Sequence, residues 1–518
     1  MFLLFAFLWL TSTVLCLIDN KSYRPSAAEL SNPSIYPKRS FYGIKSVQPD
    51  NWKIDDLTGN GVGGVALNFP WSDFQPTGKR KPCSSDEIEY DEYCFKPAHE
   101  ALTKLYTDRQ LMITAVLIIP PLWARKQNTD CKQANQNFCA PDNADDFGRF
   151  AGFLASRYNG KNNVGRICEF VIMNEVNAAE WYNTGCGNGK ACNIDNWVKN
   201  YGNVYIAAYD QIKKHQPQAP VLISLEHHFD SVFDQHINAR SPIMSGRTFL
   251  TKLAPQLGAR NWSVAFHSYP PSLLHAEFSA NDWPKITFGN VNILVGWLMK
   301  TYPNKPSTWK VYLTENGINS VQPYSNEQKQ HDQLCKAFRN ILATPNIELF
   351  VYHRLKDHAV ETKDGLGLGL VNENGQYKKS WSLWALTNRY DVGKLSCGFE
   401  ILPFLSLKRS HHATKGHWTS TRSVPDDYKL EREWRIYREQ QPGTRMIFEC
   451  QKLDKHNFPS VHQDCEKQDA LGPLGYILID KKDKTSPVYR CRNTVDYFIT
   501  SDANCEGFTN EGLLGYAF

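Results

Sequence analysis

The sequence lacks most of the features that mark membrane-spanning, zinc-binding and nucleic-acid-binding proteins. Beyond its first residues it has no apolar run close to the roughly 20 residues that a helix needs to cross a bilayer. Its 58 basic and 53 acidic residues leave a net charge of only +5, so a nucleic-acid partner is not expected. Neither the cysteine spacing of a zinc site nor the Gly-x-Ser-x-Gly and His-Glu-x-x-His motifs occur. We therefore expect no metal, no stable membrane insertion and none of the chemistry that those two motifs carry.

The N-terminus carries the one strongly apolar segment. Its first ten residues, MFLLFAFLWL, are all apolar, and a short polar break leads to Val14-Leu15-Cys16. This pattern predicts a signal peptide at residues 1–16, although no Lys or Arg precedes the apolar run. An uncleaved anchor is the alternative, disfavoured because the run is shorter than a membrane span. We expect a secreted protein, or one in the lumen of the secretory or lysosomal pathway, with candidate N-glycosylation at Asn20 and Asn261.

Fourteen cysteines fit an oxidising compartment, where disulfides form. Most fall into short-range groups: Cys83/Cys94, Cys131/Cys139, Cys186/Cys192, and Cys450, Cys465, Cys491 and Cys505 near the C-terminus. Spacing alone does not give the connectivity. Removal of Cys16 with the signal leaves an odd number, and Cys168 and Cys335, within apolar segments, are the expected buried thiols.

The 518 residues are too many for one typical core, which stops growing near roughly 250–300 residues. Short apolar, β-branched runs alternate with amphipathic stretches from about residue 40, which is typical of repeated βα units. The expected strands are Ser40–Lys45, Val62–Asn68, Leu111–Ile119, Ile167–Met173, Pro220–Leu225, Trp262–His267, Trp309–Thr314 and Ile347–His353. The expected helices include Ala98–Thr107, Asp145–Tyr158, Asn196–Lys214, Phe288–Thr301, Ser325–Ala343 with Ser325 as N-cap, and Lys379–Asn388.

Eight such strands favour a closed (β/α)8 barrel at residues 17–395, of the α/β class, over an open doubly wound sheet. In a barrel of this kind, chemistry takes place where strands end and βα loops begin. The three early cysteine couples follow the second, third and fourth strands, so we expect them to staple loops on that catalytic face.

Two expected strand ends carry glutamates. The fourth ends with Asn174-Glu175, and the seventh ends with Glu315. Glycosidic cleavage needs one carboxylic acid to protonate the leaving oxygen and one carboxylate to attack or to activate water, which two glutamates facing each other across a barrel mouth provide. A lone glutamate at a strand end is more often a salt-bridge residue, whereas this pair is more specific.

These motifs resemble the retaining glycoside hydrolases of clan A, whose barrels carry an acid/base Glu after Asn on strand four and a nucleophilic Glu on strand seven. By position, the resemblance implies that Glu175 is the acid/base, Glu315 the nucleophile, and Asn174 the residue that hydrogen-bonds the sugar 2-hydroxyl. It also implies that His267 and Tyr269 line the site, with Tyr269 orienting the nucleophile.

A narrower resemblance covers about residues 40–390. The sequences NEVN at 174–177, ISLEHH at 223–228 and HSYP at 267–270 are similar to a little-characterised family of barrel proteins classed as a domain of unknown function. Together the two resemblances imply a secreted retaining hydrolase that cleaves O-glycosidic bonds of a poly- or oligosaccharide by double displacement, without a metal or organic cofactor. The alternative is a catalytically silent glycan-binding or adhesion protein on the same barrel.

Some positions depart from the clan pattern. Many relatives keep an Arg at the end of strand two, where this chain has Asn68 and Trp71. Strand eight ends with Tyr352-His353 where many relatives have a sugar-stacking Trp, so either Tyr352 or His353 takes that place or, equally, these residues only pack in the core.

Several further residues are candidates for the mouth of the barrel. Trp71, Trp181 and Tyr182 are expected to stack on sugar rings or, equally, to pack in the core. His228 and its neighbours Glu226 and His227 are candidates for lining the pocket. The alternative is that they form a cluster at the rim that has no catalytic role. The loop Gly365-Leu366-Gly367-Leu368-Gly369 lacks the Lys-Ser/Thr of a phosphate-binding loop and is expected to be a plain turn.

The region at residues 396–518 loses the βα alternation and contains three repeats of about 40 residues, which indicate a β-trefoil or similar all-β domain. It resembles a small repeat domain of unknown function that is often appended to secreted enzymes, and a lectin-like module, so it is either carbohydrate-binding or structural. The repeated aromatic positions, Trp418, Phe458 and Phe498, are expected to form its core.

Overall fold

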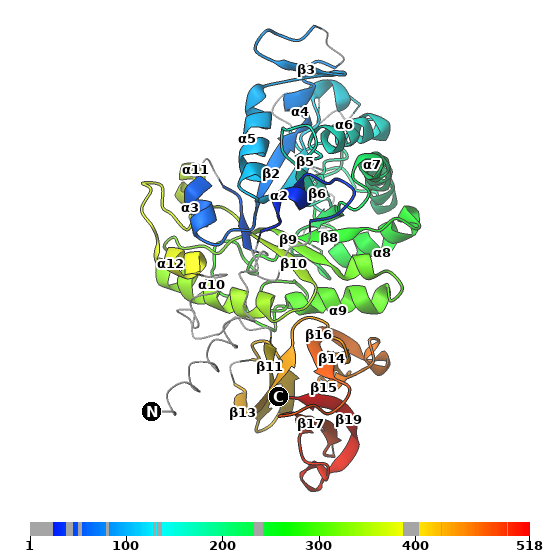
Figure 1. Ribbon diagram of the computed structural model, residues 1–518, viewed down its shortest axis with the longest axis vertical. Coiled ribbons are helices and arrows are strands. Elements are labelled where there is room, and N and C mark those ends of the chain that lie inside the picture. The colour runs from blue at the N-terminus through cyan, green and yellow to red at the C-terminus, as the bar shows by residue number, and fades with distance from the viewer. Residues whose placement is uncertain are drawn as a thin grey trace, which may run out of the picture.

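Eight parallel strands close into a barrel at the centre of the larger part of the protein (Figure 1). This computed structural model describes residues 24–37, 45–49, 54–78, 82–127, 131, 137–187, 189–232, 242–386, 404–425, 427–494 and 496–518. The barrel strands are β1 (Lys45–Val47), β2 (Gly64–Pro70), β5 (Met112–Ile118), β6 (Ile167–Ile172), β7 (Val221–Leu225), β8 (Ser263–Phe266), β9 (Val311–Asn316) and β10 (Ile347–Tyr352). Each pairs with its barrel neighbours along the chain, and β1 closes the ring on β10. The predicted (β/α)8 class is confirmed.

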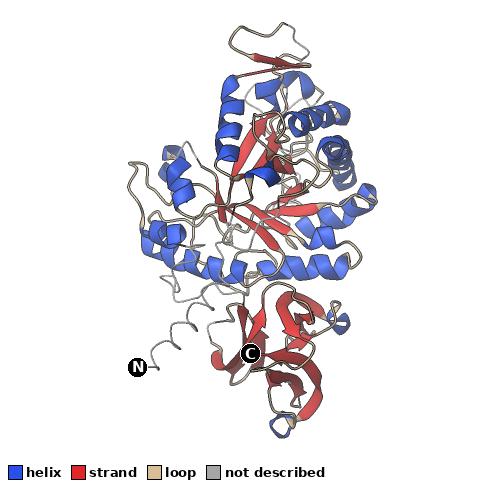
Figure 2. Ribbon diagram, in the orientation of Figure 1, coloured by secondary structure: helices blue, strands red, loops and turns tan. Residues whose placement is uncertain are grey.

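The helices surround this barrel (Figure 2). They are α2 (Ala27–Leu30), α3 (Ile54–Gly59), α4 (Trp71–Phe74), α5 (Pro97–Asp108), α6 (Ala144–Arg157), α7 (Ile194–His215), α8 (Gly246–Leu257), α9 (Val291–Thr301), α10 (Glu327–Leu342), α11 (Ala359–Lys363) and α12 (Lys379–Leu386), with single 3-10 turns at Leu122–Ala124 and Pro306–Trp309. Side-chain caps begin four of the longer helices: Asn143 for α6, Asn193 for α7, Ser245 for α8 and Asn326 for α10.

Most predicted boundaries agree with the structure, with a few differences. Of the first predicted strand, residues 40–44 lie outside the described residues, as do the predicted signal peptide and the end of the last predicted helix. Asn326, not Ser325, caps α10, because the Ser325 hydroxyl instead donates to the carbonyl of Asn319 at 2.7 Å. Helix α8 has no predicted counterpart, since Pro255 interrupts its pattern.

The barrel has two apolar layers. Alternate strand residues fill its interior and form one cluster: Ala66, Val116, Ile118, Val171, Leu222, Ala265, Tyr312, Leu349 and Val351. The intervening residues face outward into a larger core shared with the helices. The interior is therefore packed, and polar side chains gain access to solvent only at its ends.

Nine antiparallel strands follow in three units of long, short and long strand. They are β11 (Phe404–His412), β12 (Gly416–Ser420) and β13 (Lys429–Tyr437); β14 (Thr444–Gln451), β15 (Asn457–Ser460) and β16 (Asp469–Leu478); and β17 (Ser486–Arg492), β18 (Tyr497–Thr500) and β19 (Thr509–Ala517), with 3-10 turns at Cys465–Lys467 and Cys505–Gly507. The last strands of the units meet pairwise, for example through the mutual backbone hydrogen bonds of Arg435 and Phe518. An all-β region of three repeated units is therefore present; this strand pairing does not establish a β-trefoil or lectin-like identity.

The three repeated aromatic residues do not form the predicted common core, which consists instead of aliphatic residues such as Leu407, Ile447 and Val488, while Phe458 and Phe498 lie in two separate clusters. Phe458 and Phe498 are 3% and 2% exposed, whereas Trp418 is partly exposed. Trp418 differs because its indole Nε1 donates to the carboxylate of Glu449 at 2.6 Å instead of entering an apolar centre.

The all-β region packs directly on helices α9 and α10 of the barrel (Figure 1). A Cβ atom at Gly296 of α9 would lie 2.7 Å from the backbone nitrogen of Gly472 in β16, so the helix approaches the strand as closely as glycine permits. Arg438 donates to the carbonyl of Leu342 at 2.7 Å, and Lys300 donates to that of Gln468 at 2.8 Å. The two parts therefore share a close-packed boundary.

The disulfide expectations are largely confirmed. Five bonds have both cysteines among the described residues: Cys83–Cys94, Cys131–Cys139, Cys186–Cys192, Cys450–Cys465 and Cys491–Cys505. The first of them holds the hairpin of β3 (Ile88–Tyr90) and β4 (Tyr93–Phe95), which follows β2, and the next two follow β5 and β6. Cys168 is a buried thiol as expected. Cys335 is disulfide-bonded, so that expectation was wrong, because local spacing does not reveal a long-range partner.

Among the described residues, the search for a membrane-spanning helix finds none of sufficient length and apolarity.

Candidate active site

Two glutamates meet at the carboxyl ends of the barrel strands. Glu175 follows β6, the fourth barrel strand, and Glu315 lies in β9, the seventh. Both are partly exposed. A carboxylate oxygen of each, together with a ring nitrogen of His267, lies within 4.8 Å of the others. The expected pair therefore faces one shared space at the mouth of the barrel.

The backbone holds Glu175 in an unusual conformation. Its φ is +37°, and that of Met173 two residues earlier is +60°, both in the left-handed region. Ser224 at the end of β7 supports this turn, since its hydroxyl accepts from the amide of Glu175 at 3.0 Å and its carbonyl from Val176 at 2.9 Å. Such a conformation persists only where its surroundings hold it, and it is common at functional sites.

His267 and Tyr269 each contact one of the two glutamates, as the resemblance implies. His267 Nδ1 lies 2.7 Å from Glu175 Oε1, while its Nε2 lies 3.2 Å from the Thr314 hydroxyl. Tyr269 donates its hydroxyl hydrogen to Glu315 Oε1 at 3.0 Å. Both residues follow β8, which lies between the strands that carry the glutamates. The sixth strand therefore orients both carboxyl groups.

The two carboxyl groups have opposite pKa shifts. Burial raises the pKa of Glu175 to about 7, against the lowering effect of its hydrogen bond to His267. Burial would also raise the pKa of Glu315, but His353, His267 and the Tyr269 hydrogen bond outweigh it and hold that pKa below the ordinary 4.5. Near neutrality, Glu315 is therefore ionised, while about half of the Glu175 side chains keep their proton.

Residues after β10 take the place of the arginine that strand two lacks. His353 and Arg354 both lower the pKa of Glu315, and they come from the strand next to β9. The ring of His353 is in turn hydrogen-bonded to Gln48, just after β1. The sequence shows both His353 and Arg354 at a strand end, but their effect on Glu315 depends on the closure of β10 against β9.

The remaining predicted residues divide into those at the mouth and those in the core. Asn68 lies on the same face of β2 as the interior Ala66 and is exposed, so it lines the mouth. Asn174 is buried directly before Glu175. Trp181 is partly exposed, and its ring centroid lies 4.4 Å from that of Phe138, which packs above the barrel interior. Phe138 was not predicted; its position beside Cys139 in a disulfide-closed loop is the available signal.

Three aromatic candidates are not at the mouth. Trp71 is 0% exposed and stacks on Phe150 of α6 with ring centroids 5.7 Å apart, because α4 begins at Trp71 and turns its side chain into the helix layer. Tyr182 is buried, and its hydroxyl donates a hydrogen bond to Asn200 Oδ1. Tyr352 points outward from β10, and its hydroxyl donates to the carbonyl of Leu368 at 2.8 Å. Their core alternatives are the correct ones.

His228 belongs to a buried cluster beside the mouth. Both its backbone amide and its ring contact the carboxylate of Glu226, which also accepts from Asn177 Nδ2 at 2.8 Å. Burial lowers the pKa of neighbouring His227 to about 4. The Glu226–His227–His228 group and the Glu175–His267–Glu315 group both place ligand atoms close enough for a metal ion. One hydrogen-bonded pair lies in each group, Glu226 with His228 and Glu175 with His267. These contacts do not test metal binding, so the expectation of no metal stays a prediction.

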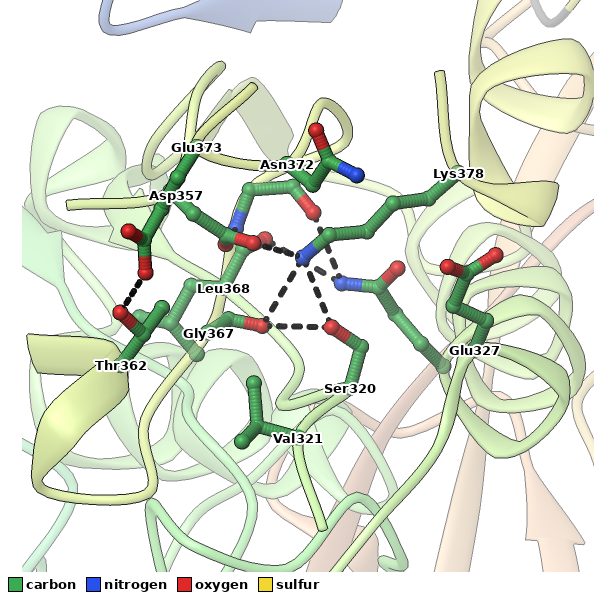
Figure 3. Close-up of polar contacts among 12 residues, drawn as sticks. Ser320, Val321, Glu327, Asp357, Thr362, Gly367, Leu368, Asn372, Glu373 and Lys378 are labelled. Carbon is green, nitrogen blue, oxygen red and sulfur yellow. Dashed lines mark hydrogen bonds and ion pairs between the residues drawn. The ribbon is translucent and has the colours of Figure 1, made fainter. Parts of the chain in front are cut away.

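The glycine-rich loop is part of a buried ionic cluster (Figure 3). Lys378 Nζ lies 2.6 Å from Asp357 Oδ2 and donates to the Ser320 hydroxyl at 2.7 Å. Asp357 accepts from the amide of Gly369 at 2.7 Å, and a Cβ at Gly367 would lie 2.4 Å from Val321. The glycines thus serve close backbone packing, and the cluster ties the loop after β9 to the loop after β10.

The fold and the site together define a closed (β/α)8 barrel protein with two glutamates at the carboxyl ends of its strands. The chain belongs to a family of unknown function, DUF5722, whose model matches residues 37–393. This agrees with the narrower resemblance seen in the sequence. No curated protein matches the chain.

Several solved structures share the fold. An exo-β-1,4-mannosidase from Opitutaceae bacterium strain TAV5 is 15% identical, with a TM-score of 0.40, and the match covers 72% of this chain but only 62% of the mannosidase. A family 1 β-glucosidase from Thermotoga maritima is 13% identical, with a TM-score of 0.42 and coverage of 68% and 87%. A glucosidase from Croceicoccus marinus is 10% identical, with a TM-score of 0.44 and coverage of 70% of each chain. Identities and scores this low carry no conclusion about activity.

The placement of the tryptophans gives a first prediction. Trp71→Ala removes a fully buried aromatic side chain and is expected to lower the free energy of unfolding by about 3–5 kcal/mol. Trp181→Ala, at a partly exposed ring, is expected to cost markedly less. Thermal and denaturant unfolding of the two variants measure this difference. Equal losses in both would place Trp71 and Trp181 in similar environments, contrary to the structure.

Proposed function

We propose that this protein is a retaining glycoside hydrolase that acts on the O-glycosidic bonds of a poly- or oligosaccharide. The observation that carries the proposal is the Glu175–Glu315 pair, with carboxylate oxygens within 4.8 Å and with opposite pKa shifts. Retaining enzymes keep their carboxyl groups about 5–5.5 Å apart, whereas inverting enzymes need about 6.5–9.5 Å to admit a water molecule. The short separation favours retention.

The mechanism follows from the two protonation states. Glu315, ionised and oriented by Tyr269, attacks the anomeric carbon, while protonated Glu175 gives its proton to the leaving glycosidic oxygen. A covalent glycosyl-enzyme forms on Glu315. Glu175, now ionised, takes a proton from water, which attacks the anomeric carbon and releases Glu315. The hydrogen bond to His267 keeps Glu175 in position through both steps.

Residues around the pair would hold the sugar. Asn174 is proposed to hydrogen-bond the 2-hydroxyl, and exposed Asn68 to contact the sugar from β2, two strands away around the barrel. The Trp181–Phe138 pair offers aromatic surface beside the barrel interior, suited to the apolar face of a pyranose. We propose action outside the cytosol, and the five disulfides support this location.

The first functional prediction concerns the two glutamates. Glu315→Gln and Glu175→Gln are each expected to reduce turnover of a susceptible glycan by about 10²-fold or more, because each removes the reacting form of a group. Glu169→Gln is the matched control, since Glu169 lies inside the barrel and accepts from Thr114 and Tyr36 away from the mouth. Turnover is measured on a panel of oligosaccharides and aryl glycosides. Binding without turnover by the unmutated protein would instead support the silent glycan-binding alternative.

The pH dependence gives a second prediction. Activity requires protonated Glu175 and ionised Glu315, so kcat/KM is expected to fall as pH rises past about 7 and to fall again below the ordinary range of a glutamate. Tyr269→Phe removes a hydrogen bond that lowers the pKa of Glu315, so the acidic limb is expected to move to higher pH. Tyr182→Phe, at a buried tyrosine away from the mouth, is the control and should leave both limbs in place. An acidic limb that is unchanged in Tyr269→Phe would contradict the assigned role.

A further inference from the structure

A cavity of about 920 Å³ lies between the barrel and the all-β region, outside the mouth. Helix α9 and the loop before it form one wall, and β12, the loop after it and the starts of β15 and β16 form the other. Its volume is within the range of small-molecule and cofactor sites, roughly 300–1,000 Å³. Trp297, Trp283, Trp418 and Tyr428 contribute aromatic surface to it. A smaller cavity of about 330 Å³ shares Asn281, Lys415 and Pro425 with it and extends the space.

The repeated aromatic residue has a different cross-strand partner in the first unit than in the second and third units. In the strand pairing, Phe458 lies opposite Cys450, Phe498 opposite Cys491, and Trp418 opposite Ser410. The second and third units therefore close this position with a disulfide, and the first does not. We call the contact between two neighbouring units a junction. The junction at Trp418 faces the cavity and can be compared with those at Phe458 and Phe498.

At two junctions an arginine covers the phenyl ring. The guanidinium of Arg490 lies 5.6 Å from the centroid of Phe458, and that of Arg409 lies 4.8 Å from the centroid of Phe498. Each arginine also pairs with a glutamate of the unit whose ring it covers: Arg490 with Glu466 at 2.6 Å, and Arg409 with Glu506 at 2.8 Å. These two rings are sealed in the interior of the region.

The first junction carries different residues at the same positions. Glu449 stands where the other units have Arg409 and Arg490, and Trp418 stands where they have phenylalanine. Trp418 Nε1 and the Ser420 hydroxyl both donate to the Glu449 carboxylate, which also pairs with Arg422. The carboxylate holds the edge of the indole, so Trp418 borders the cavity instead of lying beneath a guanidinium.

Several charges of the cavity wall are paired within the protein, while Lys300 donates to the carbonyl of Gln468, and Lys455 and Asp469 add one charge of each sign. The pairs are Arg247 with Asp230, Lys415 with Asp427, and Arg422 with Glu449. Uncharged polar groups, among them the side chains of Asn281 and Gln451, stand beside the aromatic rings. Such a wall suits a ligand with many hydroxyl groups and no net charge better than a phosphate or carboxylate ligand.

We infer that this cavity is a second, non-catalytic binding site for a neutral oligosaccharide, with a sugar ring packed against Trp418. The internal comparison carries the inference: at one junction of three, a glutamate stands in place of the covering arginine, no disulfide closes the aromatic position, and the aromatic residue is a tryptophan that borders a cavity. The inference does not depend on the catalytic proposal, because none of its residues lies at the mouth of the barrel. It also locates the site on the first repeat, which is the most divergent of the three in sequence.

The test uses the full chain with Glu315→Gln, so that oligosaccharides are not consumed. Cellotetraose, mannotetraose, xylotetraose and chitotetraose are titrated by calorimetry against this protein and against the same protein with Trp418→Ala. Binding of at least one of them is expected to weaken by about tenfold or more in Trp418→Ala, as loss of a stacking ring predicts. Trp418→Phe keeps a ring and is expected to retain most of the affinity.

Two controls keep the outcome unambiguous. Tyr377→Ala removes an exposed aromatic ring of the barrel, outside the cavity, and should leave binding unchanged. If Trp418→Ala unfolds in a thermal scan, Tyr428→Ala, at the rim of the same cavity, takes its place. No binding by any of the four oligosaccharides, or binding that neither cavity variant weakens, overturns the inference. Turnover by the unmutated protein is measured separately. A negative binding result therefore does not contradict the catalytic proposal.

Discussion

Two carboxyl groups whose oxygens lie within 4.8 Å of each other in a mostly buried mouth do not both ionise readily. This constraint governs the candidate site. His353, His267, the Tyr269 hydrogen bond and Arg354 stabilise the negative charge on Glu315. Burial raises the pKa of Glu175 to about 7 against the lowering effect of His267, and repulsion by Glu315 adds a smaller contribution. The two carboxyl groups therefore differ in protonation, which is the difference that the proposed acid and nucleophile roles require.

The rest of the barrel keeps these groups in register. Ser224 of β7 holds the turn that presents Glu175, and Asn316 of β9 accepts from both the amide and the hydroxyl of Ser268, at 2.7 and 2.9 Å. Lys378, paired with Asp357 after β10, also donates to Ser320 after β9 and so joins the loops that follow these two strands. Each contact joins neighbouring strand ends, so the site depends on closure of the whole ring. The all-β region packs on the outside of α9 and α10, and its cavity is separate from the mouth.

Much of this arrangement follows from the sequence, because alternating βα units with glutamates at two strand ends leave few other ways to bring Glu175 and Glu315 together. Side-chain direction was harder to predict. Trp71 follows a strand as a mouth residue would, yet α4 begins there and turns it into the core. Cys335 is bonded although no cysteine is near it in sequence. Trp418 repeats the spacing of two buried phenylalanines, but the exchange of arginine for Glu449 changes its environment. Such effects arise from contacts between distant segments.

The most direct test of the account is to locate a trapped glycosyl-enzyme. The protein is incubated with activated 2-deoxy-2-fluoro glycosides, which form the covalent intermediate but release it slowly, and is then digested and mapped by mass spectrometry. The account predicts one added fluoroglycosyl group, on Glu315, and no labelling in Glu315→Gln. Stoichiometric labelling of a different carboxylate, or turnover of the glycoside with inverted anomeric configuration, would contradict it.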